Sequence, residues 1–276
     1  MADATPANRI QAAGARFFSS AIAGFFFTNA WYSLVTRLDK NAEATLMNYG
    51  YADLDGAEIA LEPRDEANRF PIQLYHHVAS RAEVRGKDVL EIGCGRGGGA
   101  SYIAGYLGPR RYVGLDINKR AVAFDRVFYE RQKNLEFVVG DAHAVPFDDG
   151  TFDMALNVES SHHYRDLGRF LREVYRVLKP GGVFLMACFP RQNEPLLRET
   201  LRQSGFVCTF EEDIAPNVTR ALERDSARRE AAVLRVCPAP LRTFGREFAG
   251  TKGSKLYESF ASGSRPYLNF VLQKPS

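Results

Sequence analysis

The sequence has little cysteine: four residues in a chain of 276. None forms a CxxC pair or has a histidine at metal-ligand spacing, which excludes a disulfide framework and a cysteine-based zinc site. We therefore expect reduced thiols in a cytoplasmic protein: Cys94, Cys188, Cys208 and Cys237. Cys94 lies inside a glycine-rich loop, where a small residue is needed, and we interpret it as structural rather than catalytic.

Excess charge of one sign is also missing. The formal net charge is +3, and no block of like charge exceeds the short basic group around Arg228, which fits a solvated helix face. This balance excludes a nucleic-acid partner. The chain also lacks internal repeats and low-complexity tracts, and its length suits one large domain with a cap.

Charge is absent from residues 17–36, "FFSSAIAGFFFTNAWYSLVT", which contain the single tryptophan. The length suits a membrane span or a signal peptide, but serine, threonine and asparagine dilute the apolar residues. Apolar side chains recur there at helical spacing, so one face is more apolar than the other. We predict amphipathic helices that cap the domain, with peripheral membrane contact as the alternative.

From about residue 83 onward, apolar strands alternate with helices. This pattern predicts a parallel sheet with helices on both faces. The expected strands are residues 87–93, 111–117, 135–141, 152–158, 182–189, 206–213 and 266–275. The expected helices are residues 98–108, 119–132, 167–179 and 194–205. We predict an N-terminal helical cap over 1–67 and a core over 68–276, with a helical cap insertion at about 216–262 before the last strand.

The stretch "VLEIGCGRGGGAS" follows a strand and opens a helix. Glycines let the backbone approach a ligand closely, and the helix N-terminus offers free N–H donors. Gly93, Gly95 and Gly98 satisfy the GxGxxG pattern, and Asp116 ends the next strand, where a carboxylate accepts ribose hydroxyls. The loop alone fits a nicotinamide dinucleotide or S-adenosylmethionine.

A dehydrogenase is the first alternative. Tyr175 and Lys179 form a YxxxK pair, and Ser161 lies upstream. However, Pro180 follows Lys179 at once and ends the helix that such a pair requires. The pair also lies too close to the glycine loop, so we disfavour this interpretation.

Further segments favour S-adenosylmethionine over a nicotinamide dinucleotide. Glu91 precedes the glycine loop, Asp141 follows "LEFVVG", and "LREVYRVLKPGG" precedes the fifth strand. Together these resemble the Rossmann-like class I S-adenosylmethionine-dependent methyltransferases. "NLEFVVGDAHAVPFDDGTFDMALNVESSHHY" and "FGREFAGTKGSKLYESFASGSRPYLNFVLQK" are similar to the mycobacterial phthiotriol/phenolphthiotriol dimycocerosate methyltransferases, which methylate hydroxyls on long lipid or polyketide chains. The resemblance covers most of residues 68–190 and 244–274.

The resemblance implies S-adenosyl-L-methionine as cofactor. It assigns Asp116 to the ribose hydroxyls, Asp141 to the adenine amino group, and Asn157 to the methionine amino group. The glycine loop would carry its backbone to the methionyl part, and the hydroxyl of Tyr75 would reach the cofactor carboxylate. The complete set of implied cofactor-binding residues is Tyr75, Gly93, Cys94, Gly95, Asp116, Ile117, Asp141, Ala142 and Asn157.

The loop "NVESSHHYRDL" carries the candidate catalytic residues. A neutral imidazole can take the proton of a hydroxyl as its oxygen attacks a methyl group. We predict His162 as this base and His163 as its orienter or a pocket wall; Glu159 would orient an imidazole or contact the cofactor. The alternative is that both imidazoles cap the next helix or fill polar space. Aromatic side chains are expected to line the substrate pocket: Trp31, Tyr32, Tyr49 and Tyr164.

No metal site is expected, because adjacent histidines diverge and no HxxxH or HxxE pair accompanies them. The prediction is therefore a cytoplasmic O-methyltransferase of secondary metabolism that acts on a hydroxyl of a hydrophobic polyketide or lipid. Two alternatives stay open: a methyltransferase-fold cyclase, and a C- or N-methyltransferase.

Overall fold

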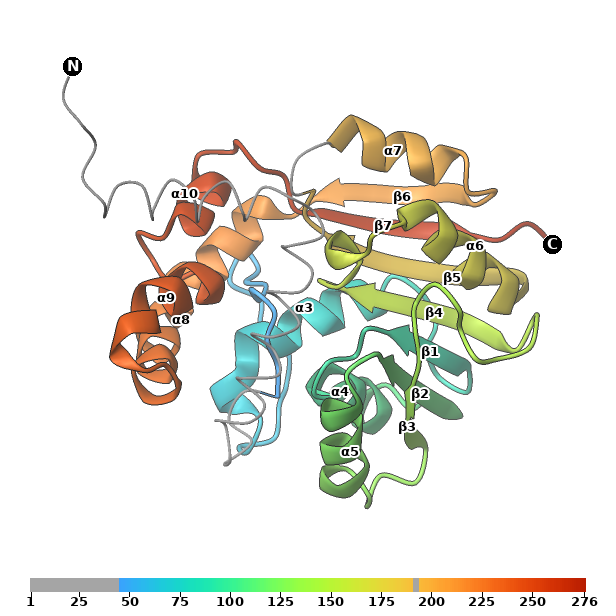
Figure 1. The fold of residues 1–276 in the computed structure, drawn as a ribbon, viewed down its shortest axis with the longest axis horizontal. Helices are drawn as coiled ribbons and strands as arrows, with labels where there is room; N and C mark the ends of the chain where they lie inside the picture. Colours follow the sequence, from blue (N-terminus) through green and yellow to red (C-terminus); the bar gives the residue numbers. More distant parts are fainter. Residues whose placement is uncertain (1–44, 191–193) are drawn as a thin grey trace.

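A computed structural model describes residues 45–190 and 194–276 of the chain. Its centre is a seven-stranded sheet in the order β3-β2-β1-β4-β5-β7-β6 (Figure 1). The strands are β1 Asp88–Ile92, β2 Arg111–Asp116, β3 Leu135–Val139, β4 Phe152–Val158, β5 Leu178–Cys188, β6 Val207–Asp213 and β7 Leu268–Gln273. All pairs are parallel except those of β7, which is antiparallel to both of its neighbours. The predicted Rossmann-like class I architecture is confirmed.

Helices cover both faces of this sheet. They are α3 Arg69–Ala79, α4 Gly98–Tyr106, α5 Lys119–Phe128, α6 Leu167–Val177, α7 Glu194–Arg202, α8 Ala215–Val236, α9 Arg242–Ala249 and α10 Lys255–Ala261. Short 3-10 turns lie at Glu66–Asn68, Ser161–His163 and Ala239–Leu241. Because each strand presents alternate residues to opposite faces, Val89 packs into the cluster under α3 and α4, and Leu90 into the cluster under α6.

The junction of α6 and β5 differs from the prediction. A helix was expected to residue 179 and a strand from 182, but α6 ends at Val177 and β5 begins at Leu178. Leu178 pairs with Phe152, and a register shift follows before the next pair. Tyr175 and Lys179 therefore lie on different elements, which removes the helical dyad of a dehydrogenase.

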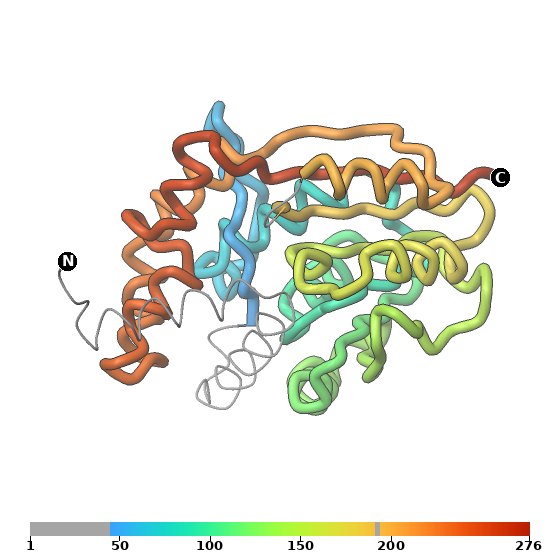
Figure 2. The backbone as a smooth tube through the Cα atoms, turned by 45° about the horizontal axis from the view of Figure 1, so that its top comes forward, coloured from blue at the N-terminus to red at the C-terminus, as the bar shows by residue number. Residues whose placement is uncertain are grey.

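The insertion before β7 forms α8, α9 and α10, which gather at one end of the molecule, opposite the C-terminus (Figure 2). Because α8 begins directly after β6 ends, these helices stand at the carboxyl edge of the parallel strands. The division into cap and core stays a prediction. Residues 1–44 of the expected N-terminal cap lie outside the described residues. None of the helices within 45–190 and 194–276 has the length and apolarity to cross a membrane.

One buried arginine joins the insertion to the rest of the fold. Arg229 of α8 donates from Nε to Asp225, and from its two other nitrogens to the carbonyls of Asn48 and Ala249, each at 2.9 Å. Asn48 belongs to the segment that precedes α3. Three parts of the chain are thus held on one guanidinium, and one of them forms a wall of the site described next.

Candidate active site

A cleft opens at the carboxyl ends of β1, β2 and β4. Its lining comes mainly from residues 45–48, the glycine loop after β1, the end of β2, the turn after β3, and the loop after β4, with Tyr75 of α3 and Ala121 of α5. Ligands of open parallel sheets bind at this edge. The cleft brings together most of the residues that the sequence singled out: Tyr75, Gly93, Cys94, Gly95, Asp116, Ile117, Asp141, Ala142, Glu159, His163 and Tyr164.

The glycine loop forms the floor of the cleft. Gly93 and Gly95 have φ angles of 80° and 59°, which disfavour other residues. A Cβ at Gly93 would lie 2.0 Å from the Oγ of Ser160, so the loop after β4 packs directly on this position. A Cβ at Gly95 would meet nothing closer than 4.0 Å, which shows that the backbone there faces open space. This open cradle fits the close approach of a cofactor.

Asp116 ends β2 beside this cradle. One carboxylate oxygen accepts the N–H of Gly95 at 2.9 Å, and the other accepts the N–H of Asn118 at 2.8 Å. Burial raises the pKa of Asp116, and these backbone N–H groups partly oppose the rise. The neighbouring Ile117 is apolar and 50% exposed. A fixed carboxylate next to an open apolar side chain suits a ribose and its attached base.

Asp141 lies across the cleft after β3. Its Oδ1 accepts both the backbone N–H and the ring Nδ1 of His143, each at 2.9 Å. Burial raises the pKa of Asp141. The two hydrogen bonds from His143 and its charge outweigh this effect, so the pKa lies below its ordinary value. Asp141 is therefore held as a carboxylate, as an acceptor for an amino group must be.

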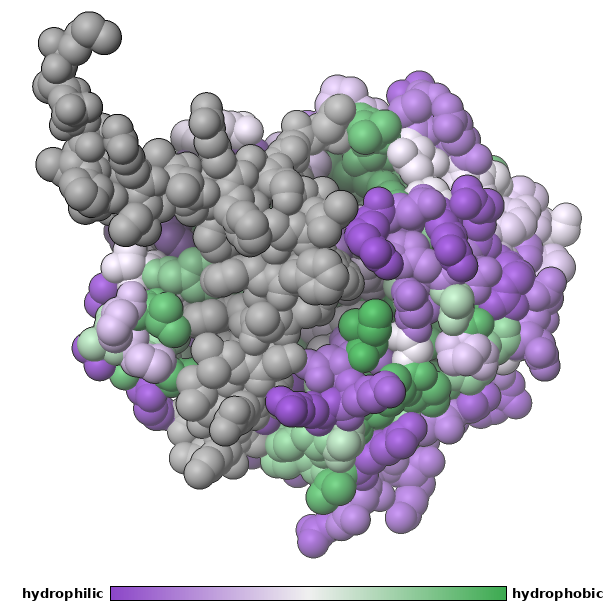
Figure 3. Space-filling view, viewed as in Figure 1, coloured by the Kyte–Doolittle hydropathy of each residue, from purple (hydrophilic) through white to green (hydrophobic). Residues whose placement is uncertain are grey.

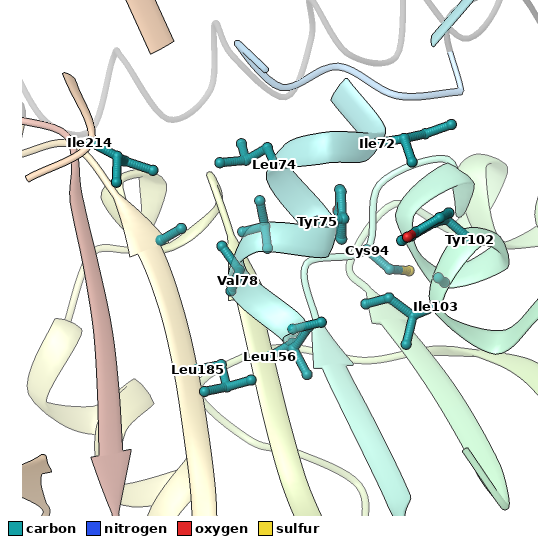
Figure 4. Packing of buried hydrophobic residues seen from close by; sticks show 14 of the residues in the cluster. Ile72, Leu74, Tyr75, Val78, Cys94, Tyr102, Ile103, Leu156, Leu185 and Ile214 are labelled. Carbon is teal, nitrogen blue, oxygen red and sulfur yellow. The ribbon is translucent and has the colours of Figure 1, made fainter. Parts of the chain in front are cut away.

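Tyr75 lines the cleft, but its hydroxyl does not face it. The O–H donates to Glu91 at 2.7 Å, and Tyr112 donates to the other oxygen of the same carboxyl at 2.9 Å. A Cβ at Gly99 would lie 2.0 Å from the Tyr75 ring. Figure 4 shows Tyr75 directed from α3 toward the glycine-loop side of the sheet. Burial raises the pKa of Glu91 to about 7. The structure thus places the Tyr75 hydroxyl on Glu91, where the sequence predicted a contact with the cofactor.

Asn157 also differs in place from the prediction. It is fully buried, its amide donates to the carbonyl of Ile92 at 2.8 Å, and its oxygen accepts the N–H of Ser161 at 2.9 Å. It holds the loop after β4 against β1 and is not among the cleft-lining residues described here. The expected substrate-pocket residue Tyr164 lies beneath the glycine loop, with its hydroxyl 2.7 Å from that of Ser160.

The loop after β4 presents two of its three candidate catalytic residues to the cleft. Glu159 and His163 line it, whereas the ring of His162 packs against Phe189, with 4.2 Å between ring centroids, and is not among the lining residues described here. The rings of His162 and His163 lie 4.1 Å apart. The two imidazoles therefore face different surroundings.

Of the four aromatic residues expected in the substrate pocket, Trp31 and Tyr32 lie outside the described residues. Tyr49 is not among the lining residues described here, but it contacts one of them, and its ring packs on buried aromatic side chains. Its backbone N–H donates to Glu159 at 2.7 Å, and its ring lies 5.5 Å from that of Phe189 and 6.0 Å from that of Phe260.

Several lining residues were missed from the sequence: residues 45–48, Ser160 and Arg165. Tyr267, which donates its hydroxyl to Glu159 at 2.7 Å, was missed too. No local motif marks these positions. Ser160 and Arg165 could have been found by extending the search along the whole loop after β4. Among residues 45–190 and 194–276, no group of side chains could hold a metal ion.

Comparison with known proteins gives the same fold and a family of methyltransferases. The family described as "Methyltransferase domain" matches residues 90–186. The chain is 40% identical over 250 residues to the phthiotriol/phenolphthiotriol dimycocerosates methyltransferase of Mycobacterium tuberculosis, covering 88% of this chain and 90% of that protein. It is 40% identical over 249 residues to the fatty-acid O-methyltransferase of Mycolicibacterium smegmatis, covering 89% of each.

Solved structures share the fold at lower identity. The cyclase SpnF superposes with a TM-score of 0.68 at 22% identity, covering 90% of this chain and 95% of that one. The geranyl diphosphate C-methyltransferase of Streptomyces coelicolor, in complex with S-adenosyl-L-homocysteine, gives a TM-score of 0.64 at 17% identity, covering 86% and 91%.

Proposed function

This chain belongs to the class I S-adenosylmethionine-dependent methyltransferases, and from this premise we propose that it methylates a hydroxyl oxygen of a hydrophobic lipid or polyketide. S-adenosylmethionine, when bound, supplies a methyl group on a positively charged sulfur. One observation carries the proposal. Asp116, the carboxylate expected to bind the ribose hydroxyls, lines the same cleft as the titratable side chains of the loop after β4. The residues described above would then bind the cofactor, orient the acceptor, and take up the proton of its hydroxyl.

An apolar acceptor is supported by the surroundings of that loop. Phe189 lies within 6 Å, between ring centroids, of Tyr49, Phe260 and Tyr267. Aromatic rings offer large apolar area with few rotamers to freeze. The two relatives at 40% identity are named for a dimycocerosate lipid and for a fatty acid, which fits the same acceptor class.

The alternatives are less well supported. The cyclase and the C-methyltransferase resemble this chain in fold alone, at 22% and 17% identity. The relatives at 40% identity over most of the chain carry the names of lipid methyltransferases, one of them explicitly an O-methyltransferase. O-methylation is therefore the favoured reaction.

The hydroxyl proton needs an acceptor, because a neutral hydroxyl is a poor nucleophile at neutral pH. We place this acceptor in the loop after β4. The sequence assigned the role to His162, with His163 as orienter, and this stays a proposal. The ring of His162 packs on Phe189, whereas Glu159 and His163 of the same loop line the cleft.

The proposed reaction predicts transfer of label from methyl-labelled S-adenosylmethionine to lipophilic alcohols. Alkanols of graded chain length should give labelled ethers, with kcat/KM rising as the chain lengthens, because each buried methylene contributes about 0.8 kcal/mol. The control is an alkane of the same length, which offers no oxygen. An isomerised acceptor without label would support the cyclase instead, and labelled carbon or nitrogen would overturn O-methylation.

We also propose that the protein touches a membrane surface to collect its acceptor. The exposed face of α5 has Val127 and Phe128 at its C-terminal end, 72% and 51% exposed. Arg120 near the start of α5 and Arg131 just beyond its end are exposed too. Figure 3 shows apolar residues over α5 beside hydrophilic ones. Apolar side chains among basic ones suit an anionic lipid surface. The expected N-terminal amphipathic contact lies outside the described residues.

Vesicle co-sedimentation tests this surface. The double change Val127→Ser and Phe128→Ser should weaken binding to phosphatidylglycerol vesicles by about tenfold, since less apolar area reaches the bilayer. Val207→Ser, at a 54%-exposed position on β6, is the matched control and should bind as the wild type does. Equal binding by all three proteins would place the contact elsewhere on the chain.

A further inference from the structure

We infer that Glu159 accepts the proton of the acceptor hydroxyl, and that its carboxylate makes the site select neutral alcohols over carboxylic acids. The inference rests on the proposed function and deepens it. It changes the assignment within the loop after β4: a carboxyl group takes the role that the sequence gave to an imidazole.

The first observation is how the carboxyl group is fixed. The backbone N–H of Tyr49 and the hydroxyl of Tyr267 both donate to Oε1 of Glu159, each at 2.7 Å. These are the hydrogen bonds of this side chain within the described residues, and both end on the same oxygen. Glu159 lines the cleft, so Oε2 is the oxygen left to face it.

The second observation is the backbone. Glu159 has a φ angle of 53°, and it is the one non-glycine residue with positive φ in the described part of the chain. Such a conformation is unfavourable for an L-residue and persists only where the surroundings enforce it, often at active sites. Here the N–H of Glu159 donates to the carbonyl of Ala187 at 2.9 Å, which ties the strained residue to β5. The fold turns this side chain into the cleft at a cost.

The charged and titratable groups around Glu159 come from five segments, its own loop included. Tyr49 and Tyr267 donate to it, and the charge of Arg229 in α8 acts on it through space. Its own charge acts on Tyr75 of α3, and His162 and His163 follow it on the same loop. Burial is the largest influence and raises the pKa of Glu159 to about 7, although the two donors and Arg229 oppose the rise. A carboxyl group with this pKa can take up a proton at neutral pH, which its ordinary counterpart does poorly.

The chemical step balances without a further reactant. The hydroxyl oxygen forms a bond to the methyl carbon as the bond from that carbon to sulfur breaks, and the electron pair of that bond stays on sulfur. The hydroxyl proton passes to Oε2 of Glu159 and is then released to solvent. His162, packed on Phe189, and His163, on the cleft wall, shape the site around this transfer.

The selection of alcohols over carboxylic acids follows from the negative charge of Glu159. A fatty acid is already ionised at neutral pH and has no proton to give. Placed where the hydroxyl binds, its carboxylate would stand against Glu159, and like charges at close range in a buried site repel strongly. The structure therefore favours the acceptor chemistry of an alcohol, although one relative at 40% identity is named for a fatty acid.

Glu159→Gln is the decisive variant. Glutamine keeps an oxygen for Tyr49 and Tyr267 but cannot take up the proton. With 1-dodecanol and methyl-labelled S-adenosylmethionine, kcat should fall by about 10²–10⁴, and the wild-type rise of kcat/KM with pH up to about 7 should disappear. Cofactor affinity, measured by calorimetry, should stay within about threefold. The ratio of dodecanoic acid to 1-dodecanol turnover should rise at least about tenfold, because the repulsion is gone.

His162→Ala is the matched control, and it should keep the pH-dependent rise. Three results would overturn the inference: full turnover of 1-dodecanol by Glu159→Gln, loss of the pH-dependent rise in His162→Ala but not in Glu159→Gln, or loss of cofactor affinity with kcat unchanged. The last would assign Glu159 to the methionine ammonium group. Absence of labelled product from both acceptors with the wild type would instead contradict the proposed function, and the inference with it.

Discussion

Replacing Arg229 by methionine should lower the free energy of unfolding by about 3–5 kcal/mol, because it leaves the buried carboxylate of Asp225 without its buried partner. Methionine fills much of the volume, so the loss is chiefly electrostatic. The change also removes the donors to the carbonyls of Asn48 and Ala249. Since the segment at Asn48 lines the cleft, cofactor affinity should fall together with stability.

Arg228→Met is the control for this effect. Arg228 donates to the same Asp225, at 2.6 Å, but its side chain is about one-third exposed. Ion pairs near the surface contribute about 0–1 kcal/mol, so this variant should unfold close to the wild-type midpoint. Urea unfolding of both variants gives the comparison. Equal losses would mean that burial of Arg229 does not set the cost.

The fold was predictable because the signals for it are local. The alternation of apolar strands and helices from β1 to β5 depends on residues near in sequence, and the expected strand at 152–158 has the bounds of β4. The glycine loop and Asp116 reached the cleft for the same reason: the loop follows β1 directly and Asp116 ends β2, and parallel strands end at one edge. Several ends moved by a few residues, such as the end of α5 at Phe128 where 132 was expected. At the α6–β5 junction the type of element changed, because Leu178, expected in a helix, pairs with Phe152 as part of a strand.

The partners of site residues were not predictable. Glu159 is held by Tyr49 and Tyr267, which are 110 and 108 residues away along the chain. The hydroxyl of Tyr75 turns to Glu91, and the amide of Asn157 turns to Ile92, because buried polar groups take the nearest partner that satisfies them. No motif records such pairings. The sequence therefore predicts well which residues lie at the site, and predicts poorly which of their atoms face the ligand.

Replacing Asp116 by alanine should weaken S-adenosylmethionine binding by about 10- to 150-fold, since losing hydrogen bonds to a charged group costs about 1.5–3 kcal/mol. The carboxylate also accepts the N–H groups of Gly95 and Asn118, so the variant loosens the cradle that receives the methionyl part. Asp116 stands at the end of β2, and the core strands pack without it. We therefore expect the fold to be retained, with a circular dichroism spectrum like that of the wild type.

Asp148→Ala is the matched control for this prediction. Asp148 is an exposed loop carboxylate outside the residues that line the cleft, and its loss should leave calorimetric affinity unchanged. Asp116→Asn separates charge from geometry. It keeps one acceptor oxygen but turns an amide N–H₂ toward a backbone donor, so affinity should fall nearly as far as in the alanine variant. Unchanged affinity in folded Asp116→Ala would remove this residue from the cofactor site, and the adenosine would then have to be held from the Asp141 side of the cleft.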